Sequence, residues 1–330
     1  MEQKKPFHES NVLGQMFWRR IAQRACLVCL KKFHENFLSK KYSVRKALVT
    51  GANGLLGRTL CNKLSQECDL YAIVRSKPKD PVDSINYISL DLSREFSFDE
   101  LPSEIDCVLH LAQSTKYKNF PEGASDVFSI NVKSTHNLLE YSRISKVKQF
   151  IYASSGGVYA ESKNPLSECS PVQEHERLGC YLGSKICGEI LVQNYSAFFT
   201  TSIVRPFFMY GIGQKRNMLL PRLFDNVSNG NSIDLSGDEG LKINPIHVDD
   251  AVRAIESLIG MNHSSIYNLA GPDVLSLREI CETIGGYLDE KPVFNHADGS
   301  SVNIVADISL MKSELHRPII SLHERIDDLR

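Results

Sequence analysis

The stretch Lys46–Gly57, KALVTGANGLLG, decides the fold. A short apolar run, Ala47–Val49, leads directly into three glycines, Gly51, Gly54 and Gly57. Where such a turn joins a strand to a helix, the first glycine makes the tight turn and the second lets the backbone approach a pyrophosphate; the third lets the helix pack closely on the strand. The spacing therefore predicts a phosphate-binding turn at the start of a helix.

The residues after this turn supply the context that a lone glycine triplet lacks. A helix is predicted from Leu55 to about Cys68, and a second apolar run, Leu70–Val74, predicts the next strand. The amide groups in the first turn of the helix would face the phosphate oxygens, at the positive end of the helix dipole. Strand, turn, helix and strand in this order favour a dinucleotide site over a purely structural turn.

The chain repeats this alternation up to about residue 210. Continuous apolar runs predict strands buried on both faces, and the segments between them have helical spacing, as in residues 131–145. The alternation predicts an α/β fold with a doubly wound parallel sheet of the Rossmann type over residues 44–210. After Gly211, loops and short elements predict a smaller substrate-binding lobe over most of residues 211–330. The predicted strands are KALVT, LYAIV, NYISL, CVLHLA, QFIYASS and TSIVRPF.

The composition narrows the class of protein. The chain of 330 residues is 42% hydrophobic, which is enough to bury a large core. A formal net charge of −1 gives no reason to expect a nucleic acid partner. Several of the nine cysteines lie inside apolar runs, as Cys107 does, which indicates reduced thiols in a cytoplasmic protein. Cys26 and Cys29 form a C-x-x-C pair without a second pair or a nearby His cluster, so no metal site is predicted.

Charge is distributed unevenly along the chain. Residues 1–46 contain 11 Lys and Arg against three acids, a net charge of +8, which leaves −9 for the rest. We expect residues 1–43 to be an extension that contains a basic amphipathic helix over residues 11–38. Two interpretations stay open: peripheral attachment to the inner, anionic face of a membrane, or packing on the enzyme's own surface or on a partner subunit. The chain has no run of about 18 uncharged apolar residues, so no transmembrane span is predicted.

The segment YLGSK places Tyr181 and Lys185 four residues apart. On a helix these two side chains share a face, so the phenol and the ammonium group point into the same pocket. A nearby cation favours the phenolate and is expected to lower the Tyr181 pKa, which suits an acid–base catalyst. Some 25 residues upstream, YASSGGVY ends a predicted strand in Ser154 and Ser155, whose hydroxyls can bind a substrate oxygen. The alternative is a solvated helix surface.

The second strand ends in Val74-Arg75-Ser76-Lys77. An acidic residue at this place would bind the adenosine ribose hydroxyls, whereas Arg75 suits a 2′-phosphate. The residue favours NADP(H) over NAD(H), although a solvated arginine at a strand end is an equally good interpretation.

The glycine turn, the strand-end serine and the Tyr/Lys helix occur in this order, and together they resemble the extended short-chain dehydrogenase/reductase family, in its NAD(P)-dependent epimerase/dehydratase branch. The resemblance covers most of residues 46–330. TGANGLLG is similar to the family's T-G-x-x-G-x-x-G, and INVKSTHNLLE resembles its active-site helix, here with Asn131. VRPFFMYG, NPIHVDDAV and YNLAGPDVLSLREI are similar to later landmarks. The resemblance implies an enzyme of nucleotide-sugar metabolism, as used in polysaccharide biosynthesis.

The resemblance also implies roles for individual residues. Tyr181 is the acid–base, Lys185 holds the ribose hydroxyls, and Ser155 positions the reacting oxygen. Asp91 is placed beside the adenine ring, with Leu92 after it. For the substrate the expected contacts are Ser155, Phe208, Asn217 and Lys242. For the cofactor they are Gly51, Asn53, Gly54, Leu55, Leu56, Gly57, Arg75, Asp91, Leu92, Leu111, Ala112, Tyr181, Lys185 and Pro206.

Three departures from the family pattern limit the substrate assignment. Gly156-Gly157 stands where sugar-nucleotide dehydratases carry an Asp-Glu pair, which argues against dehydration. Phe208 replaces an Asn that holds the sugar or its diphosphate, and Ile243 replaces an Arg that clamps the diphosphate. Anion contacts could still come from Lys215, Arg216, Asn217 and Arg222.

The leading hypothesis is an NAD(P)-dependent 4-epimerase or keto-sugar reductase that acts on a sugar or sugar nucleotide by hydride transfer at a carbinol or keto carbon. One rival is an NADPH-dependent reductase of a non-nucleotide carbonyl compound, which Phe208 and Ile243 favour. Another is a non-catalytic NAD(P)-binding sensor or scaffold, against which the complete set of Ser155, Tyr181 and Lys185 argues. A homodimer is expected, because relatives commonly dimerise through two long helices.

Overall fold

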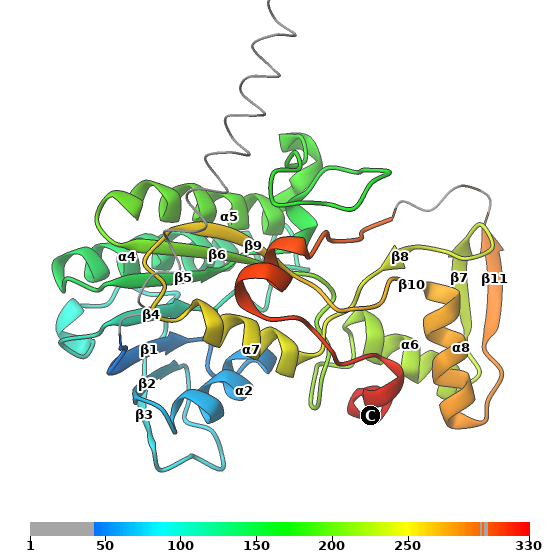
Figure 1. Ribbon diagram of the computed structural model, residues 1–330, viewed down its shortest axis with the longest axis horizontal. Coiled ribbons are helices and arrows are strands. Elements are labelled where there is room, and N and C mark those ends of the chain that lie inside the picture. Colours follow the sequence, from blue (N-terminus) through cyan, green and yellow to red (C-terminus); the bar gives the residue numbers. More distant parts are fainter. Residues whose placement is uncertain (1–42, 298, 300–302) are drawn as a thin grey trace, which may run out of the picture. The chain divides into compact units, whose positions relative to one another are not determined.

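A parallel sheet runs through the centre of the described chain and carries helices on both faces (Figure 1). The computed structural model describes residues 43–297, 299 and 303–330. The predicted basic helix over residues 11–38 and the Cys26/Cys29 pair lie outside these residues. The sheet confirms the predicted α/β fold.

Within the described residues the main sheet has seven strands in the order β3-β2-β1-β4-β5-β6-β9, and every neighbouring pair is parallel. The six predicted strands are all present, and β9 is an addition. Consecutive strands run outward from β1 in opposite directions, so the order reverses between β1 and β4, where ligands bind in folds of this kind. The strands are β1 (Lys46–Thr50), β2 (Asp69–Val74), β3 (Ile85–Ser89), β4 (Cys107–His110), β5 (Gln149–Ala153), β6 (Thr200–Pro206) and β9 (Ser265–Leu269).

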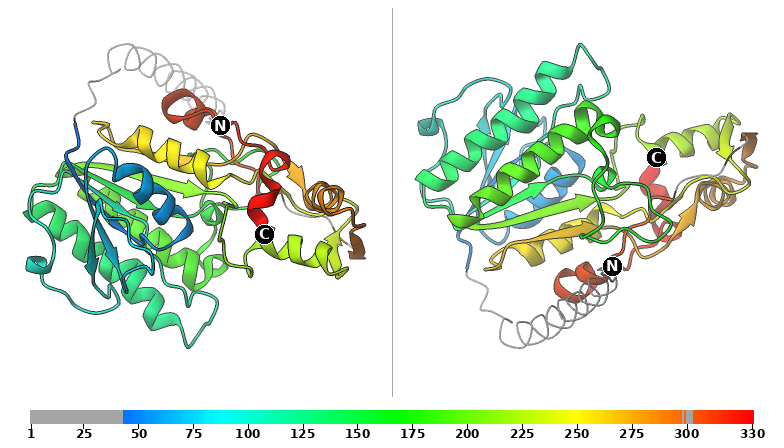
Figure 2. Two further views of the ribbon diagram at one scale, coloured as in Figure 1. Left: turned by 90° about the horizontal axis from the view of Figure 1, so that it is seen from below. Right: turned by 90° about the horizontal axis from the view of Figure 1, so that it is seen from above.

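Alternate residues of β1 enter two different cores. Ala47 and Val49 pack with α2 (Leu55–Leu64) and α7 (Val248–Leu258) on one face of the sheet. Leu48 packs on the other face, with α4 (Ser134–Ile144) and α5 (His175–Asn194). The two views in Figure 2 show these helix pairs covering opposite faces. Burial on both sides explains why the strand reads as a continuous apolar run.

Apart from α7 and β9, most elements after β6 form a smaller lobe with its own apolar core. The predicted division at residue 210 needs a correction, because the chain returns to the sheet with α7 and β9 before it enters the lobe again. The sequence did not predict this return to the sheet, because the strand SIYNL is short and lies between loops. The lobe elements are α6 (Leu219–Ser228), β7 (Ser232–Ser236), β8 (Lys242–Ile243), β10 (Leu275–Ser276), α8 (Leu277–Leu288) and β11 (Val293–Ala297).

The segment IHVDD joins α7 to the C-terminal residues. His247 Nδ1 accepts a hydrogen bond from the Asp249 amide, so Nε2 carries the proton that it shares with Asp328 at 2.9 Å. Asp250, which is fully buried, accepts hydrogen bonds from His316 Nε2 and from the amide groups of residues 319 and 320. His247 and Asp250 therefore hold the C-terminal residues against α7.

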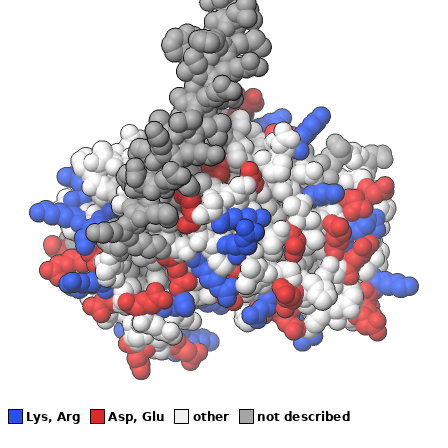
Figure 3. Space-filling view, viewed as in Figure 1, with Lys and Arg blue, Asp and Glu red and all other residues white. Residues whose placement is uncertain are grey.

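In the face shown in Figure 3, acidic and basic side chains of the described residues alternate over the surface. None of the helices described here is long and apolar enough to cross a membrane.

Candidate active site

A cavity of about 750 Å³ lies at the carboxyl ends of the strands, beside the point where the strand order reverses. Nearly all the predicted site residues line it. Lys185 and Lys242 are not among the lining residues. Those brought together are Gly51, Asn53, Gly54, Leu55, Leu56, Gly57, Arg75, Asp91, Leu92, Leu111, Ala112, Ser155, Tyr181, Pro206, Phe208 and Asn217.

The glycine turn has the geometry that a dinucleotide phosphate requires. Gly51 has φ +72°, and a Cβ there would lie 2.7 Å from the Ala112 amide nitrogen. A Cβ on Gly57 would lie 2.2 Å from the Gly51 carbonyl oxygen. Gly54 is the N-cap of α2, and no side chain caps that end of the helix. The uncapped amide groups and the glycines at positions 51, 54 and 57 fit a pyrophosphate.

The adenosine end of the cavity is formed by the ends of β2 and β3. Asn53 Nδ2 donates to the Ser76 carbonyl at 3.0 Å, which ties the glycine turn to the end of β2. Arg75 is exposed and lines the cavity. The Asp91 carboxylate accepts from the Ser93 amide and hydroxyl, at 3.0 and 2.8 Å, and these bonds lower its pKa, with smaller contributions from Arg94 and Arg75.

A buried hydrogen-bonded layer fixes the next strand against the turn. The Thr135 hydroxyl donates to the Asn131 carbonyl, so His110 Nε2 must donate to Thr135 Oγ1, at 2.9 Å. His110 Nδ1 then accepts from the Thr50 hydroxyl at 2.7 Å, and Thr50 Oγ1 accepts from the Ala112 amide. Burial lowers the His110 pKa to about 3, so the imidazole is neutral and structural.

Tyr181 lies in α5 with its ring against the ring of Tyr117, at a centroid distance of 4.7 Å. Its hydroxyl donates to Gln113 Oε1 at 2.9 Å. Burial raises the Tyr181 pKa to about 12, Tyr117 adds to the increase, and the Ser155 hydroxyl acts in the opposite direction. The expectation that Lys185 lowers this pKa is therefore wrong for this arrangement.

The Lys185 side chain points away from the Tyr181 hydroxyl, toward the end of β5, and this explains why it does not lower the Tyr181 pKa. Its ammonium group donates to the Ala153 carbonyl at 2.8 Å and lies 5.3 Å from the centre of the Tyr152 ring. The residue is 1% exposed, and burial lowers its pKa to about 7, whereas Glu189 raises it. The cation therefore lies beneath the end of β5, next to the cavity and behind its wall.

Glu189 connects Lys185 to a second buried cation. Its carboxylate accepts two hydrogen bonds from one edge of the Arg205 guanidinium, one from Nε to Oε1 at 2.9 Å and one from Nη2 to Oε2. Both side chains are at most 5% exposed. The guanidinium also lies 4.6 Å from the centre of the Tyr159 ring. Sequence reasoning missed this pair, although Glu189 follows Lys185 by one helical turn and therefore shares its face.

Ser155 begins the short 3₁₀ segment Gly156–Val158, where its hydroxyl accepts from the Gly157 amide at 3.2 Å. It lines the cavity together with Tyr181. Ser154 also lines the cavity, but its hydroxyl is buried and has no hydrogen-bond partner among the described residues. Of the two strand-end serines, Ser155 is the one whose hydroxyl shares the open part of the cavity with the phenol.

The predicted substrate contacts separate into two groups. Phe208 lines the cavity with a φ of +41°, which is unusual for a bulky residue. The Asn217 carbonyl accepts from Lys118 at 3.1 Å. Lys242 is exposed on β8 and does not belong to the described cavity lining, so the structure does not bring it to the site. Ile243 is buried in the core of the smaller lobe.

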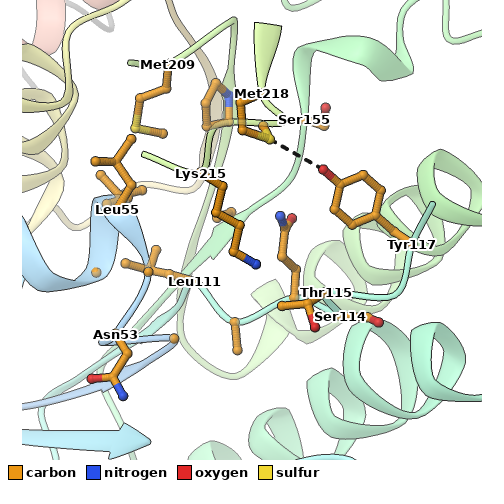
Figure 4. A pocket seen from close by; sticks show the side chains of 18 of the residues that line it. Asn53, Leu55, Leu111, Ser114, Thr115, Tyr117, Ser155, Met209, Lys215 and Met218 are labelled. Atoms are coloured by element: carbon orange, nitrogen blue, oxygen red, sulfur yellow. Dashed lines mark hydrogen bonds between the residues drawn. The ribbon is translucent and has the colours of Figure 1, made fainter. Parts of the chain in front are cut away.

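The loop after α5 and β6 supplies cations of two kinds. Lys215 projects into the cavity between Leu111 and Met218 (Figure 4). Arg216 is held by Asp225, with Nε 3.0 Å from Oδ2, and it also contacts the Leu329 carbonyl. Lys215 therefore faces the cavity, whereas Arg216 fastens the loop to the lobe. Arg222 does not line the cavity within the described residues.

Comparison with known proteins identifies the family of the chain. Residues 47–270 match the family model described as the NAD dependent epimerase/dehydratase family. An uncharacterized UDP-glucose epimerase, YtcB of Bacillus subtilis, is 26% identical over 82% of this chain and 92% of its own. The dTDP-4-dehydro-6-deoxyglucose reductase of Escherichia coli is 26% identical over 86% of this chain and 95% of its own.

Two solved structures have a similar fold. MoeE5 in complex with UDP-glucose and NAD is 25% identical, with a TM-score of 0.73, over 86% of this chain and 97% of that one. UDP-glucuronic acid 4-epimerase from Bacillus cereus, solved with UDP-glucuronic acid and NAD, is 23% identical with a TM-score of 0.75 over the same shares. Because the family model covers more than half of the sequence, the chain belongs to the NAD dependent epimerase/dehydratase family.

Proposed function

We propose that this protein is an NAD(P)-dependent enzyme that oxidises a carbinol carbon or reduces a keto carbon of a sugar or sugar nucleotide, as a 4-epimerase or a keto-sugar reductase. The observation that carries the proposal is that Tyr181 and Ser155 line the same cavity as the glycine turn. Relatives named as a UDP-glucose epimerase and as a dTDP-sugar reductase support the substrate class.

A nicotinamide cofactor held by the glycine turn would supply the hydride chemistry. The protein's own residues manage the proton and the orientation of the substrate. Tyr181 gives its phenolic proton to the substrate oxygen in reduction and takes it back in oxidation, while the Ser155 hydroxyl holds that oxygen. Lys185 supports the end of β5 through its hydrogen bond to the Ala153 carbonyl, and it would hold the ribose hydroxyls of the cofactor.

Dehydration is disfavoured by the packing around Gly156. A Cβ at this position would lie 2.5 Å from the Phe207 ring, so an aspartate has no room without moving that ring. Phe207 is buried and therefore has little freedom to move. The site is thus suited to proton and hydride transfer at a carbinol, without a second acid to expel water.

Family membership establishes NAD dependence, and Arg75 supports a preference for NADP(H). Its exposed guanidinium at the end of β2 could pair with a 2′-phosphate. The preference is tested by comparing kcat/KM for the two cofactors in the parent enzyme and in Arg75→Ala. Loss of affinity for NADP(H) alone supports it, whereas equal values for both cofactors in the parent enzyme reject it.

A reductase of a non-nucleotide carbonyl compound is the second candidate. One part of the cavity is apolar, lined by Phe208, Met209, Met218 and Leu219. Ile243, which replaces the family's diphosphate-clamping arginine, is buried in the core of the smaller lobe. A sugar nucleotide remains the leading substrate, because Lys215 lines the same cavity and can bind a phosphate.

Two further proposals concern assembly. Exposed apolar side chains on the face covered by α4 and α5, among them Phe128, Ile144 and Ile190, support a homodimer through these helices.

Peripheral membrane attachment through residues 11–38 is tested by comparing the full chain with a chain that begins at residue 43. Loss of liposome binding with retained turnover supports attachment, and unchanged partitioning contradicts it.

The proposed reaction is tested with purified protein. Mass spectrometry identifies any cofactor that co-purifies, and nicotinamide absorbance is then followed with UDP-, dTDP-, GDP- and CDP-sugars. We expect turnover with at least one sugar nucleotide. Turnover only with simple ketones or aldehydes would favour the second candidate.

A further inference from the structure

The residue after the predicted cofactor-lining pair Leu111 and Ala112 is Gln113, and its backbone is fixed on both sides. The Ala112 amide donates to Thr50 Oγ1 at 3.1 Å. The Ser114 amide donates to Asn131 Oδ1 at 2.9 Å, and that asparagine is buried. Gln113 itself is exposed and lines the cavity. A rigid backbone thus presents a flexible polar side chain to a ligand.

The carboxamide of Gln113 is hydrogen-bonded to the hydroxyl of Tyr181, the proposed acid–base residue. Its Oε1 accepts the hydrogen bond of the Tyr181 hydroxyl at 2.9 Å. The amide nitrogen has no partner among the described residues, so its two N–H groups are available to a ligand. Any oxygen that approaches the phenol closely enough to exchange a proton must therefore come beside Gln113.

Tyr117 restricts the direction of that approach. Its ring packs on the Tyr181 ring, and its hydroxyl donates to Met218 Sδ at 3.6 Å (Figure 4). One face of the phenol is thereby covered by an aromatic ring that is itself held by the loop after β6. The open approach to the Tyr181 oxygen lies between Ser155 and Gln113, which both line the cavity.

The chemistry of a carboxamide selects the group that it can bind. A neutral amide offers a donor and an acceptor side by side, which matches a hydroxyl, itself a donor and an acceptor. An anionic phosphate or carboxylate is matched better by Arg or Lys. In a sugar ring, the carbon next to the reacting carbinol carries such a hydroxyl.

We propose that Gln113 binds the substrate hydroxyl on the carbon adjacent to the reacting carbon. In the complex the reacting oxygen takes over the hydrogen bond of Tyr181, and the released carboxamide turns to the neighbouring hydroxyl. Gln113 is then a specificity-determining residue that favours polyhydroxylated substrates over carbonyl compounds that lack the second hydroxyl. This inference rests on the proposed function.

The test combines an enzyme variant with a substrate analogue. The parent enzyme and Gln113→Ala are each measured with UDP-glucose, or with the dTDP sugar if that is the substrate, and with its 3-deoxy analogue, for reaction at C4. We expect Gln113→Ala to lower kcat/KM for the parent sugar by about tenfold to a hundredfold, the typical cost of an unpaired buried polar group. With the deoxy analogue the same substitution should have little effect.

The outcomes separate the two claims. Equal losses on the parent sugar and the deoxy analogue contradict the inference and leave Gln113 a support for Tyr181 alone. No turnover of any sugar nucleotide by the parent enzyme contradicts the proposed function, and the inference with it. Gln66→Ala, at an exposed position after α2 and outside the cavity, serves as the matched control and should match the parent enzyme. Thermal unfolding of each variant verifies that it is folded.

Discussion

The Lys185 ammonium group binds the carbonyl oxygen of Ala153, at 2.8 Å, at the end of the strand that delivers Ser155 to the cavity. Lys185 is almost completely buried, yet it lies in the same helix as Tyr181. The lysine therefore supports the strand end that carries the serine hydroxyl, while the phenol faces the ligand. The two side chains therefore have different surroundings, although they lie in one helix.

Tyr181→Phe should abolish turnover and leave cofactor affinity nearly unchanged. The substitution removes the proton that the substrate oxygen needs but keeps the ring that packs on Tyr117. General acid–base groups typically contribute about 10² to 10⁴ in rate, so we expect a loss in kcat of that order. Steady-state kinetics and a titration of reduced cofactor by fluorescence measure the two effects. Tyr71→Phe, on β2 and outside the cavity lining, is the control; near-normal turnover by Tyr181→Phe would rule out the assigned role.

The kcat/KM of the reductive direction should fall as pH rises above about 7. Burial lowers the Lys185 pKa from 10.5 to about 7, so the ammonium form is complete below that pH and is lost above it. The groups packed around it are His110, which is neutral, the Tyr152 phenol and Glu189. Because kcat/KM reports the free enzyme, a pH profile reveals this titration. A flat profile between pH 6 and about 9 would contradict the dependence on a charged Lys185.

Glu189→Gln should move the predicted fall in kcat/KM to lower pH and should also destabilise the fold. Glu189 raises the Lys185 pKa, so its removal lets burial lower that pKa further. Arg205 would also be left buried without its carboxylate partner, and breaking a buried pair in this way costs about 3–5 kcal/mol. Denaturant unfolding and the pH profile measure the two consequences. An unchanged profile in a folded variant would show that Glu189 does not act on Lys185.

Alanine at the second and third glycines of the turn should have different effects. A Cβ on Gly57 would lie 2.2 Å from the Gly51 carbonyl oxygen, whereas a Cβ on Gly54 would lie 3.2 Å from it. Gly57→Ala should therefore lower thermal stability, and Gly54→Ala should fold but bind the cofactor more weakly, since its Cβ faces the pyrophosphate. Calorimetry and cofactor titration distinguish the two; equal behaviour of both variants would argue against the assigned geometry.

Much of the fold could be predicted from the sequence, because strands buried on both faces carry continuous apolar runs such as KALVT and CVLHLA. The strand β9 escaped prediction. Its five residues lie among loops, and its place beside β6 depends on a crossover through α7 that no local pattern records.

The lining of the site could be predicted where a motif fixes the backbone, as at Gly51 and Gly57. The direction of Lys185 and the contact of Gln113 with Tyr181 could not, because each depends on which carbonyl or hydroxyl the fold brings near. Lys242 is exposed on β8 and is not among the residues that line the described cavity, so its predicted contact with the substrate stays a prediction.

The central claim is hydride transfer between the substrate carbon and the bound nicotinamide. It is tested most directly with a sugar nucleotide deuterated at the reacting carbon and enzyme loaded with oxidised cofactor, followed by mass spectrometry of the released cofactor. The account predicts that the parent enzyme either transfers the deuterium to the reduced nicotinamide, if it is a reductase, or returns it to the reacting carbon of the product, if it is a 4-epimerase, and that Tyr181→Phe forms no product. Product in which the reacting carbon has exchanged its deuterium for solvent hydrogen, with no deuterium in the cofactor, would contradict it.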